Sequence, residues 1–496
     1  MTLIQIKNLT FRYDNSFENV FDHVSFSFDS SYKSALIGRN GRGKSTLLKL
    51  LMNQYEYRGE ILIKEKCEYF PYYVENTNQW TLDVCYEIEP TIQQWQLEKE
   101  LNQLNVDSGI LYRIFDTLSK GEQTKVLLAI LFLKPNSYLL IDEPTNHLDQ
   151  ESREIVASYL KKQKGFLLVS HDRSFIDQCC DHIIAMNPSS IDVVQGSFTS
   201  WYEDKTRKDE SEIEKNIRLK KNIGQMEASR KQTENWSNKV EKSKNGRSAS
   251  GLKQDKGYVG HKAAKMMKRS KNIENRMNKA IEEKRSLLKD IEVYDDLKLA
   301  PLEYFQNTLC SFFHVSIFYD NQFLFKDLNL IIHKGERILL KGKNGCGKSS
   351  VIRMIISNDI EYKGDFIVGS RLKISYVPQD CSWLNGNLDE LIDQYHVDHT
   401  LVKTILRKLG FSRSQFEMNM EYYSEGQKKK VLLAISLSTS AHLYIWDEPL
   451  NYIDIYSRIQ IENLIKEYQP TLLFVEHDAF FQKEIATKII DYSHLV

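Results

Sequence analysis

The stretch LIGRNGRGKSTLLKLL, residues 36–51, decides the fold because it sets a glycine-rich turn between two apolar runs. Its centre, GRNGRGKS, fits the pattern G-x-x-x-x-G-K-[ST], in which backbone N–H groups and a helix N-terminus surround phosphate groups. Lys44 would reach the terminal phosphates, and Ser45 would offer its hydroxyl to magnesium. The motif needs a strand before it and a helix after it, so this stretch predicts a strand, a phosphate loop and a helix.

A second stretch of the same kind, LLKGKNGCGKSSVIRMI, occupies residues 339–355 and belongs to an internal duplication. Order and spacing are kept at offsets of about 305 residues by five pairs: Tyr13 and Tyr319, Gly38 and Gly342, Ser119 and Ser424, Asp142 and Asp447, His171 and His477. Residues 1–200 and 305–496 are therefore predicted to be two copies of one domain, termed the first and second copies, with residues 201–304 between them.

Short apolar runs end where the polar motifs begin in both copies. The runs are SALIG, YLLIDE and GFLLVSHD in the first copy and RILLKG, LYIWDE and TLLFVEHD in the second. Continuous runs of this length predict strands buried on both faces, alternating with helices. The fold class is therefore α/β, with a mainly parallel sheet in each copy, and ligands are expected at the carboxyl ends of the strands.

Paired acidic residues end one of these strands in each copy. Asp142 and Asp447 are placed to hold hydrated magnesium, and Glu143 and Glu448 follow them, where each could orient an attacking water. The segments PTNHLD or PLNYID and a strand that ends at His171 or His477 come next. A lone Asp-Glu pair is often only a solvated loop start, but this context favours a catalytic interpretation with Mg²⁺ as a cofactor.

The segments LSKGEQ, residues 118–123, and YSEGQ, residues 423–427, resemble the signature of ABC-type ATPases. The resemblance implies two tandem P-loop ABC ATPase domains that pair within one chain and enclose two ATP molecules. Ser119 and Ser424 would lie at helix N-termini and touch the ATP held by the opposite copy, so each site needs both copies. Tyr13 and Tyr319 would stack on adenine, although a strand tyrosine can also be packing.

The resemblance implies these nucleotide contacts in the first copy: Tyr13, Gly38, Asn40, Gly41, Gly43, Lys44, Ser45, Thr46, Ser119, Gly121 and Glu122. In the second copy they are Tyr319, Gly342, Asn344, Gly345, Gly347, Lys348, Ser349, Ser350, Ser424, Gly426 and Gln427. The expected magnesium contacts are Ser45, Asp142, Ser349, Gln379 and Asp447, and the expected catalytic residues are Glu143, His171, Glu448 and His477.

The two copies differ at one position that the family uses to sense magnesium and water. The second copy has Gln379 in YVPQ, but the first has Tyr72 in YFPY, and a phenol cannot replace a flexible amide. The signature YSEGQ, which would serve the first phosphate loop, also lacks the usual leading leucine and middle glycine. We therefore expect both sites to bind ATP and the first to turn over more slowly.

The segment between the copies is basic. Residues 205–290 contain 25 Lys plus Arg against 12 Asp plus Glu, although the whole chain has a formal net charge of zero. Sparse apolar residues at a three-four spacing predict two long helices, separated by the Gly- and Ser-rich residues 244–257. The prediction is a helical hairpin whose arms, at about forty residues each, would reach roughly 60 Å.

Such a hairpin could be a solvated spacer or a binding surface. Residues 231–280 hold 14 basic and only 4 acidic side chains, whereas a spacer stabilised by ion pairs would balance the two signs. Excess positive charge on a long protrusion suits a polyanion, and the scarcity of aromatic residues favours phosphate contacts on structured RNA. A nucleic-acid partner is therefore expected.

Two ABC domains joined by a basic helical linker, with DEPTNHLD in the first copy, resemble the ABC-F proteins over essentially the whole chain. The resemblance implies a partner, the bacterial 70S ribosome, with contacts to 23S rRNA, the exit-site region and the peptidyl-tRNA. In that family the ATP-closed form occupies the tRNA exit site, and the linker points toward the peptidyl transferase centre.

Three features resemble the antibiotic-resistance branch, which protects against lincosamides, streptogramin A compounds and pleuromutilins. Two of them are DEPLNYID in the second copy and the long linker. The third is the short distance of about 45 residues between Tyr72 and Ser119, which has no room for the arm insertion of the housekeeping translation factors. By that resemblance the linker tip would promote drug release, by contact or by rearranging rRNA. The tip residues would be Lys242, Lys244, Arg247, Leu252, Lys253 and Lys256.

Two other functions share these motifs. A general translation or ribosome-assembly factor of the ABC-F type would cause growth defects on deletion without any drug. The ATPase subunit of a drug exporter would need separate membrane subunits, and such ATPases lack a basic hairpin of about a hundred residues.

The composition bears on localisation. Hydrophobic residues make up 41% of the chain and charged residues 27%, with seven cysteines and no CxxC pair. The N-terminus lacks a signal-peptide pattern, and no apolar run approaches the length of a membrane helix. A cytoplasmic, ribosome-associated monomer with no membrane subunit is the expectation.

Overall fold

A computed structural model describes residues 2–14, 19–146, 148–187, 190–243, 268, 271, 276, 297–319, 322–343, 345–357 and 359–492. Side chains are not described for residues 229, 230, 232–243, 319, 322 and 323. Contacts within the chain divide it into two units, one of residues 1–201 with 294–496 and one of residues 202–293. The first unit holds both copies.

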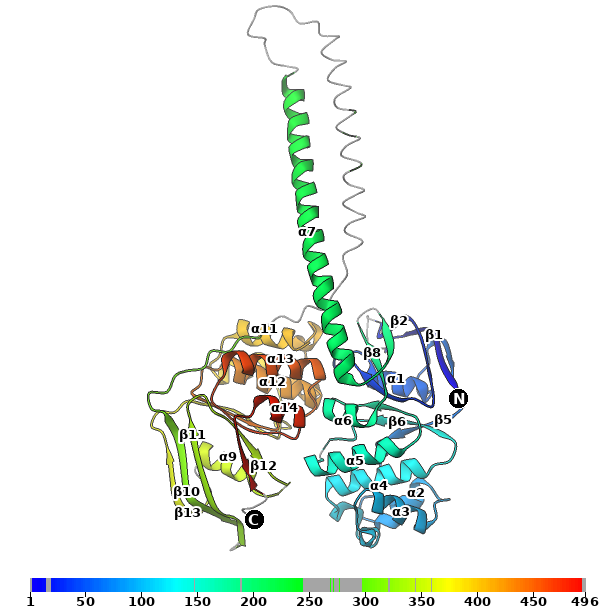
Figure 1. The fold of residues 1–496 in the computed structure, drawn as a ribbon, viewed down its shortest axis with the longest axis vertical. Coiled ribbons are helices and arrows are strands. Elements are labelled where there is room, and N and C mark those ends of the chain that lie inside the picture. The colour runs from blue at the N-terminus through cyan, green and yellow to red at the C-terminus, as the bar shows by residue number, and fades with distance from the viewer. Residues whose placement is uncertain are drawn as a thin grey trace, which may run out of the picture. The chain divides into compact units, whose positions relative to one another are not determined.

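The first copy contains two sheets (Figure 1). A six-stranded sheet has the order β5 Lys66–Phe70, β6 Ser137–Asp142, β7 Phe166–Val169, β3 Lys33–Ile37, β8 His182–Met186 and β9 Ile191–Gln195. All its pairings are parallel except that of β8 with β9. A three-stranded antiparallel sheet has the order β2 Phe21–Asp29, β1 Leu3–Phe11 and β4 Arg58–Leu62.

Strand β6 shows why a continuous apolar run makes a central strand. Tyr138 and Leu140 face one core, which is shared with β1, β2 and α1 Lys44–Leu51. Leu139 and Ile141 face the other core, which is shared with α2 Thr81–Ile88, α3 Gln94–Gln103, α4 Lys120–Leu133, α5 Gln150–Lys162 and α6 Arg173–Cys179. Side chains of a strand alternate between its faces, so both layers need apolar residues, and each such side chain contributes about 1.5–3 kcal/mol when fully buried.

The second copy repeats this arrangement. A parallel sheet has the order β14 Ile374–Val377, β15 Leu443–Asp447, β16 Leu472–Val475, β12 Arg337–Lys341 and β17 Lys488–Asp491. An antiparallel sheet has the order β11 Gln322–His333, β10 Thr308–Tyr319 and β13 Tyr362–Val368. The helices are α9 Lys348–Ile356, α10 Leu388–Gln394, α11 His399–Lys408, α12 Glu425–Ser438, α13 Ile455–Tyr468 and α14 Ala479–Ile485.

The predicted α/β class with two tandem domains is confirmed, and one feature of it was missed. The six quoted apolar runs all form parallel strands, namely β3, β6, β7, β12, β15 and β16. The antiparallel sheet of each copy was not predicted. Its strands alternate buried and exposed residues over only part of their length, as β2 does, so the period-two signal is weak.

The predicted boundary between linker and second copy, at residues 304 and 305, falls inside a segment that packs on the second copy. Leu297 and Leu299 are buried in the core formed by α10 to α14. The N–H of Leu302 donates to the Ala441 carbonyl at 2.8 Å, and the Tyr304 hydroxyl donates to the Ser370 carbonyl at 2.8 Å. Residues 297–304 therefore anchor the chain to this copy.

Helix α7, Phe198–Ser243, contains 46 residues, which corresponds to about 70 Å. Its exposed charges form short-range pairs, with Arg207 3.8 Å from Glu203 and Arg218 3.8 Å from Glu214. The predicted tip at 244–257 and the apolar seam of the returning arm, from Val259 to Ile291, lie outside the described residues. A search of the described helices finds none with the length and apolar character that crossing a membrane requires.

Candidate functional site

The first phosphate loop lies between β3 and α1, as the motif requires. The Lys44 ammonium donates to the carbonyls of Gly38 at 2.7 Å and Arg39 at 3.2 Å, and to Asn40 Oδ1 at 3.3 Å. Gly41 and Gly43 have φ of 84° and 90°, in the left-handed region that glycine adopts without strain. A Cβ at Gly43 would lie 2.6 Å from Val20 Cγ1, so the loop must approach β2 without a side chain there.

The second phosphate loop, between β12 and α9, has the same construction. Lys348 donates to the carbonyls of Gly342 and Lys343, both at 2.8 Å. Gly345 and Gly347 have φ of 81° and 98°. In each copy the loop backbone curves around the lysine, which is the arrangement that presents N–H groups and an ammonium group to phosphates.

A hydroxyl and a carboxylate meet beside each loop. Ser45 Oγ donates to Asp142 Oδ2 at 2.9 Å, and in the second copy burial raises the pKa of Asp447 while the Ser349 hydroxyl opposes that shift. Among the residues that the structure describes, none hydrogen-bonds the buried Asp447 Oδ1, and burial raises the pKa of both aspartates. A divalent cation would offset that burial, so these residues fit Mg²⁺ held by serine and aspartate oxygens, where it would neutralise phosphate charge.

A glutamate and a histidine face each other next to each magnesium pair. His171 Nε2 lies 3.4 Å from Glu143 Oε1, and His477 Nε2 lies 3.3 Å from Glu448 Oε1. Both glutamates have positive φ, 49° and 48°, and each donates its N–H to the strand of its histidine. The backbone therefore turns each carboxylate toward the imidazole that follows the neighbouring strand.

The electrostatic surroundings of the two glutamates differ. Burial and the adjacent Asp142 carboxylate raise the pKa of Glu143 to about 8. Burial also opposes ionisation of Glu448, but His477 and Gln379, with the charge of Lys429, lower the pKa of Glu448. Burial, followed by the charges of Lys44 and Arg458, lowers the pKa of His171. At neutral pH, Glu448 is therefore ionised, whereas Glu143 is largely protonated.

The signature segments cap helices in the manner expected for a helix N-terminus. Ser119 Oγ accepts from the Glu122 N–H at 3.2 Å, and the Glu122 carboxylate accepts from the Ser119 N–H at 2.8 Å. Ser424 and Gln427 form the same reciprocal box at the start of α12. Each box fixes the first turn of its helix and leaves other N–H groups of that turn free to meet an anion.

The signature of the first copy faces Glu448 and His477 of the second copy across a cavity of about 530 Å³. The volume is in the range of small-molecule sites. Its lining comprises Ser119, Lys120, Gly121, Glu122, Lys125, Leu148, Asp149, Ser152 and Arg153 from the first copy, and Lys343, Gln379, Glu448, Asn451 and His477 from the second. We term this region, with residues 342–350, the second ATP site.

The first ATP site, which pairs residues 38–46 with the signature at 424–427, is joined by direct contacts. Asn40 Nδ2 donates to the Tyr452 carbonyl at 3.0 Å, while Asn40 Oδ1 lies 3.1 Å from His171 Nε2. A Cβ at Gly426 would lie 3.3 Å from Asn40 Nδ2 of the first copy and 2.5 Å from the Tyr452 carbonyl. The second copy's signature and PLNYID segment therefore meet the first copy's phosphate loop.

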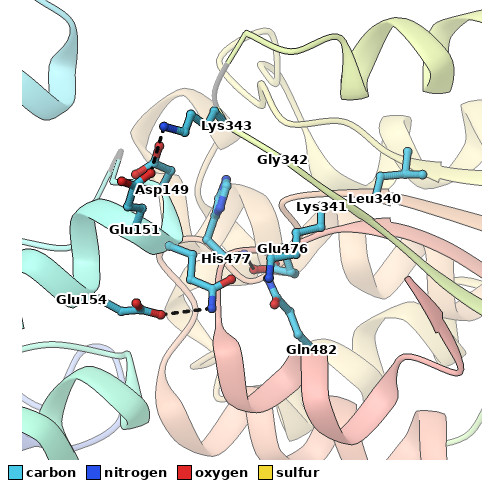
Figure 2. A pocket seen from close by; sticks show the side chains of 11 residues that line it. Asp149, Glu151, Glu154, Leu340, Lys341, Gly342, Lys343, Glu476, His477 and Gln482 are labelled. Atoms are coloured by element: carbon cyan, nitrogen blue, oxygen red, sulfur yellow. Dashed lines mark hydrogen bonds and ion pairs between the residues drawn. The ribbon is translucent and has the colours of Figure 1, made fainter. Parts of the chain in front are cut away.

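A smaller cavity of about 220 Å³ lies beside the second phosphate loop (Figure 2). Lys343 of that loop extends to Glu151 of α5, with 3.0 Å between Nζ and Oε2. Glu476 and His477 line the same space. The contact links the second phosphate loop to the helix that follows PTNHLD in the first copy.

The position that differs between the copies also differs in geometry. Gln379 and Glu448 both line the second ATP site. Tyr72 packs instead against the first copy's helical core, with the Lys134 ammonium 5.0 Å from its ring centroid. The Tyr69 hydroxyl donates to Asp142 Oδ2 at 3.0 Å, so the first copy presents a phenol to its magnesium aspartate and no amide from this loop to Glu143.

Other predicted residues are placed as follows. Tyr13 donates to, or accepts from, Thr46 Oγ1 at 2.8 Å and lies edge-on to Phe11 and Tyr55. Ser350 is in the first turn of α9. Asn344 lies outside the described residues, as do Lys244, Arg247, Leu252, Lys253 and Lys256, and the side chains of Tyr319 and Lys242 are not described. The individual roles of the site residues remain predictions.

Sequence reasoning missed two contacts in the site. Asn451 Nδ2 donates to Glu448 Oε2 at 2.6 Å, and Tyr69 binds Asp142 as described. Both positions carried a signal, since Asn451 matches Asn146 and Tyr69 matches Tyr376 in the duplication. A residue that is identical in both copies and lies close to a motif could have been predicted to contact the site.

Comparison with known protein families finds that residues 21–146 and 325–451 match the ABC transporter family. The chain belongs to the ABC transporter family. Its copies are ABC ATPase domains, which hydrolyse ATP to ADP and phosphate with Mg²⁺ as the usual cofactor.

Relatives and solved structures resemble the whole chain. It is 29% identical to the ATP-binding protein Uup of Buchnera aphidicola, over 98% of this chain and 80% of the relative. It is 27% identical to the ribosome protection protein VmlR of Bacillus subtilis, over 96% of this chain and 85% of the relative. An archaeal ribosome recycling factor, solved with a ribosomal stalk protein, matches with a TM-score of 0.62 at 18% identity, over 98% of this chain and 87% of that chain.

Because the two ATP sites differ in structure, replacing the glutamate of one site should reduce ATP hydrolysis more than replacing the glutamate of the other. Glu448→Gln should remove most steady-state ATP hydrolysis, whereas Glu143→Gln should remove less than about half, because Gln379 and a lowered pKa support Glu448 alone. Phosphate release by each purified variant at saturating ATP measures the difference. Equal losses in the two variants would contradict the asymmetry.

Proposed function

We propose that this protein is an ABC-F ATPase that binds the bacterial ribosome at the tRNA exit site and protects it from antibiotics of the peptidyl transferase centre. ATP closes the two copies, and the closed form inserts the linker beside the peptidyl-tRNA. Drug release follows from that insertion. Hydrolysis at the two sites opens the pair and releases the protein.

The observation that carries ATP gating is the cavity shared by Ser119 of one copy and Glu448 and His477 of the other. A nucleotide there would contact both copies, so its binding energy favours the closed pair, and its hydrolysis removes the phosphate that joins them. Ser119 at the start of α4 would meet phosphate with N–H groups. Glu448, held by Asn451 and His477, would orient the water.

The charge of the linker supports an RNA partner. Residues 205–290 carry 25 basic and 12 acidic side chains, and the described part of α7 pairs Arg207 and Arg218 with acids on the same helix. Residues 231–280 hold 14 basic side chains and only 4 acidic ones. Most of these positive charges therefore have no acidic side chain in the segment to pair with and could contact phosphates. The positive excess is therefore concentrated toward the predicted tip.

The relatives support the ribosome as the site of action. VmlR carries the name ribosome protection protein and aligns with 96% of this chain. The absence of an arm insertion also favours the resistance branch, because residues 72–119 contain only α2, α3 and two short 3-10 turns, Ser108–Tyr112 and Phe115–Thr117. Lincosamides, streptogramin A compounds and pleuromutilins are the proposed drugs.

A general translation factor is the second candidate. It is favoured by the similarity to Uup, which is as extensive as that to VmlR and carries no resistance function in its name. In vitro translation separates the two. Adding the protein with ATP to bacterial extract blocked by a lincosamide should restore synthesis if it protects the ribosome. Restored synthesis only in extracts lacking drug, from ribosomes stalled by other means, would support the general factor.

The linker charge gives a further prediction. Replacing Lys242, Lys244 and Lys253 by glutamine should weaken ribosome binding and reduce the slope of log affinity against log salt by about 0.7–0.9 for each phosphate that is no longer neutralised. Binding at several potassium concentrations measures the slope. Neutralising Lys161, Lys162 and Lys164, at the end of α5, is the matched control. An unchanged slope in the linker variant would make the hairpin a spacer.

A further inference from the structure

Lys429 is a buried cation in α12 that the site described above does not explain. The residue is only 1% exposed. Its ammonium group donates to the Pro378 carbonyl at 2.7 Å and to the Asp447 carbonyl at 3.5 Å. Removing an ammonium group from water is costly, and two carbonyl contacts recover only part of that cost.

The two carbonyls belong to the two segments that build the second ATP site. Pro378 directly precedes Gln379, and Asp447 ends β15 directly before Glu448. Gln379 and Glu448 both line the cavity. Lys429 therefore joins the loop of the glutamine to the strand of the glutamate from behind the cavity.

The charged groups around Lys429 come from several elements. Asp447 and Glu448 at the end of β15 and Glu476 at the end of β16 interact with it electrostatically, whereas the nearby Cys381 thiol, whose pKa burial raises to about 12, is neutral. Glu476 is itself 4% exposed and accepts from the Leu450 N–H at 2.7 Å, which fixes the start of the PLNYID segment. Lys429 thus sits among the backbone segments that carry Gln379, Glu448 and Asn451.

The first copy lacks both buried charges. Thr124 occupies the position of Lys429, and its hydroxyl donates to the Lys120 carbonyl of its own helix at 2.9 Å. Ser170 occupies the position of Glu476. The same copy carries Tyr72 in place of the glutamine, packed away from Glu143. Within this chain, the lysine is present where the glutamine is present.

We propose that Lys429 is a positioning residue for ATP hydrolysis at the second site, which holds Gln379 against Glu448 so that both can order the attacking water. It touches no nucleotide and acts through the Pro378 and Asp447 carbonyls. Without it the loop beyond the Val377–Trp446 pairing of β14 with β15 would lose its side-chain link to β15, and Gln379 would move relative to Glu448. The proposal concerns hydrolysis by the isolated protein and is independent of the ribosome.

The test measures hydrolysis in a Glu143→Gln background, so that turnover comes from the second site. Lys429→Met keeps the length of the side chain and removes the donor. It should lower kcat by about ten- to a hundredfold, the scale of a displaced catalytic group, and change KM for ATP by less than about threefold, because the phosphate loop is untouched. Unchanged kcat would overturn the proposal.

A double-mutant cycle separates positioning from a purely structural role. If Lys429 acts through Gln379, adding Lys429→Met to Gln379→Ala should cost little further kcat, because the group being positioned is already gone. Additive losses would overturn the proposal. Lys429→Gln, which keeps a donor without the charge, should recover part of the activity and provides a second variant if the methionine protein fails to fold.

Lys428→Met is the matched control on the same helix. Its ammonium group lies 3.5 Å from the Ser382 carbonyl, and its side chain is absent from the lining of the second ATP site. Lys428→Met should leave kcat within about twofold of the background. If it lowers kcat as much as Lys429→Met, the effect is that of disturbing α12, and the proposal fails.

Discussion

The Glu143→Gln, Glu448→Gln double variant should remain bound to bacterial ribosomes in the presence of ATP and dissociate in its absence. Glutamine preserves the volume of each side chain but cannot accept a proton from water, so hydrolysis should fall by at least about a hundredfold. Ser45, Lys44 and their counterparts in the second copy are unchanged, so nucleotide binding and closure should persist. Co-sedimentation with 70S ribosomes, with ATP and without nucleotide, measures retention.

Each outcome of that experiment has a definite meaning. Retention with ATP alone would establish a nucleotide-gated ribosome factor and lead directly to drug-displacement assays. Free dissociation in ATP would contradict the proposed cycle, in which hydrolysis resets the closed form. No retention in either state would remove the ribosomal function. A Lys44→Met, Lys348→Met variant, in which neither loop can offer an ammonium group to phosphate, is the control that should not be retained.

The sequence predicted the fold correctly where an apolar run is followed directly by a polar motif. The apolar runs that end at Asp142 and Asp447 had to be strands buried on both faces, and the phosphate loops had to lie at their carboxyl edge. The antiparallel sheets were missed because strands such as β2 are only partly buried and carry a weak alternation. Sequence patterning therefore located the parallel core and left its outer sheet undetected.

The motifs indicated residues for both sites, whose individual roles remain predictions, but the difference between the two sites was only partly evident from the sequence. Tyr72 against Gln379 was evident as a departure between the copies. Lys429 and Glu476 were not, because lysine and glutamate are rarely fully buried, and only the structure shows that they are 1% and 4% exposed. Interactions between distant segments determine that burial, and no local pattern records them.

Replacing Lys430 by methionine should destabilise the second copy by about 3–5 kcal/mol. The Lys430 ammonium lies 2.6 Å from Asp454 Oδ2, and Asp454 is fully buried. Asp454 also caps α13 by accepting from the Ser457 N–H at 3.0 Å, so removing the lysine leaves a buried carboxylate with no cationic partner among its described contacts. Hydrogen exchange in α12 and α13 should accelerate accordingly, which measures the destabilisation locally.

The first copy provides the control for this prediction. Lys125 matches Lys430, but among the described residues no carboxylate lies within ion-pair distance of its ammonium group, and Asp149 caps α5 at the edge of the second ATP site. Lys125→Met should therefore cost about 1 kcal/mol or less. If Lys430→Met is no more destabilising than Lys125→Met, the buried pair contributes nothing beyond packing.

The lowered pKa of Asp454 determines how the stabilisation by this ion pair should change with pH. Burial opposes ionisation of Asp454, but the charge and hydrogen bond of Lys430 lower its pKa below that of an exposed aspartate. The folded state therefore binds this proton less readily than the unfolded state, and the stabilisation is complete above the unfolded pKa of about 4. As the pH falls below that value, the advantage of the parent protein over Lys430→Met should shrink. A difference that grows on acidification would contradict the ion pair, since protonating Asp454 can only weaken it.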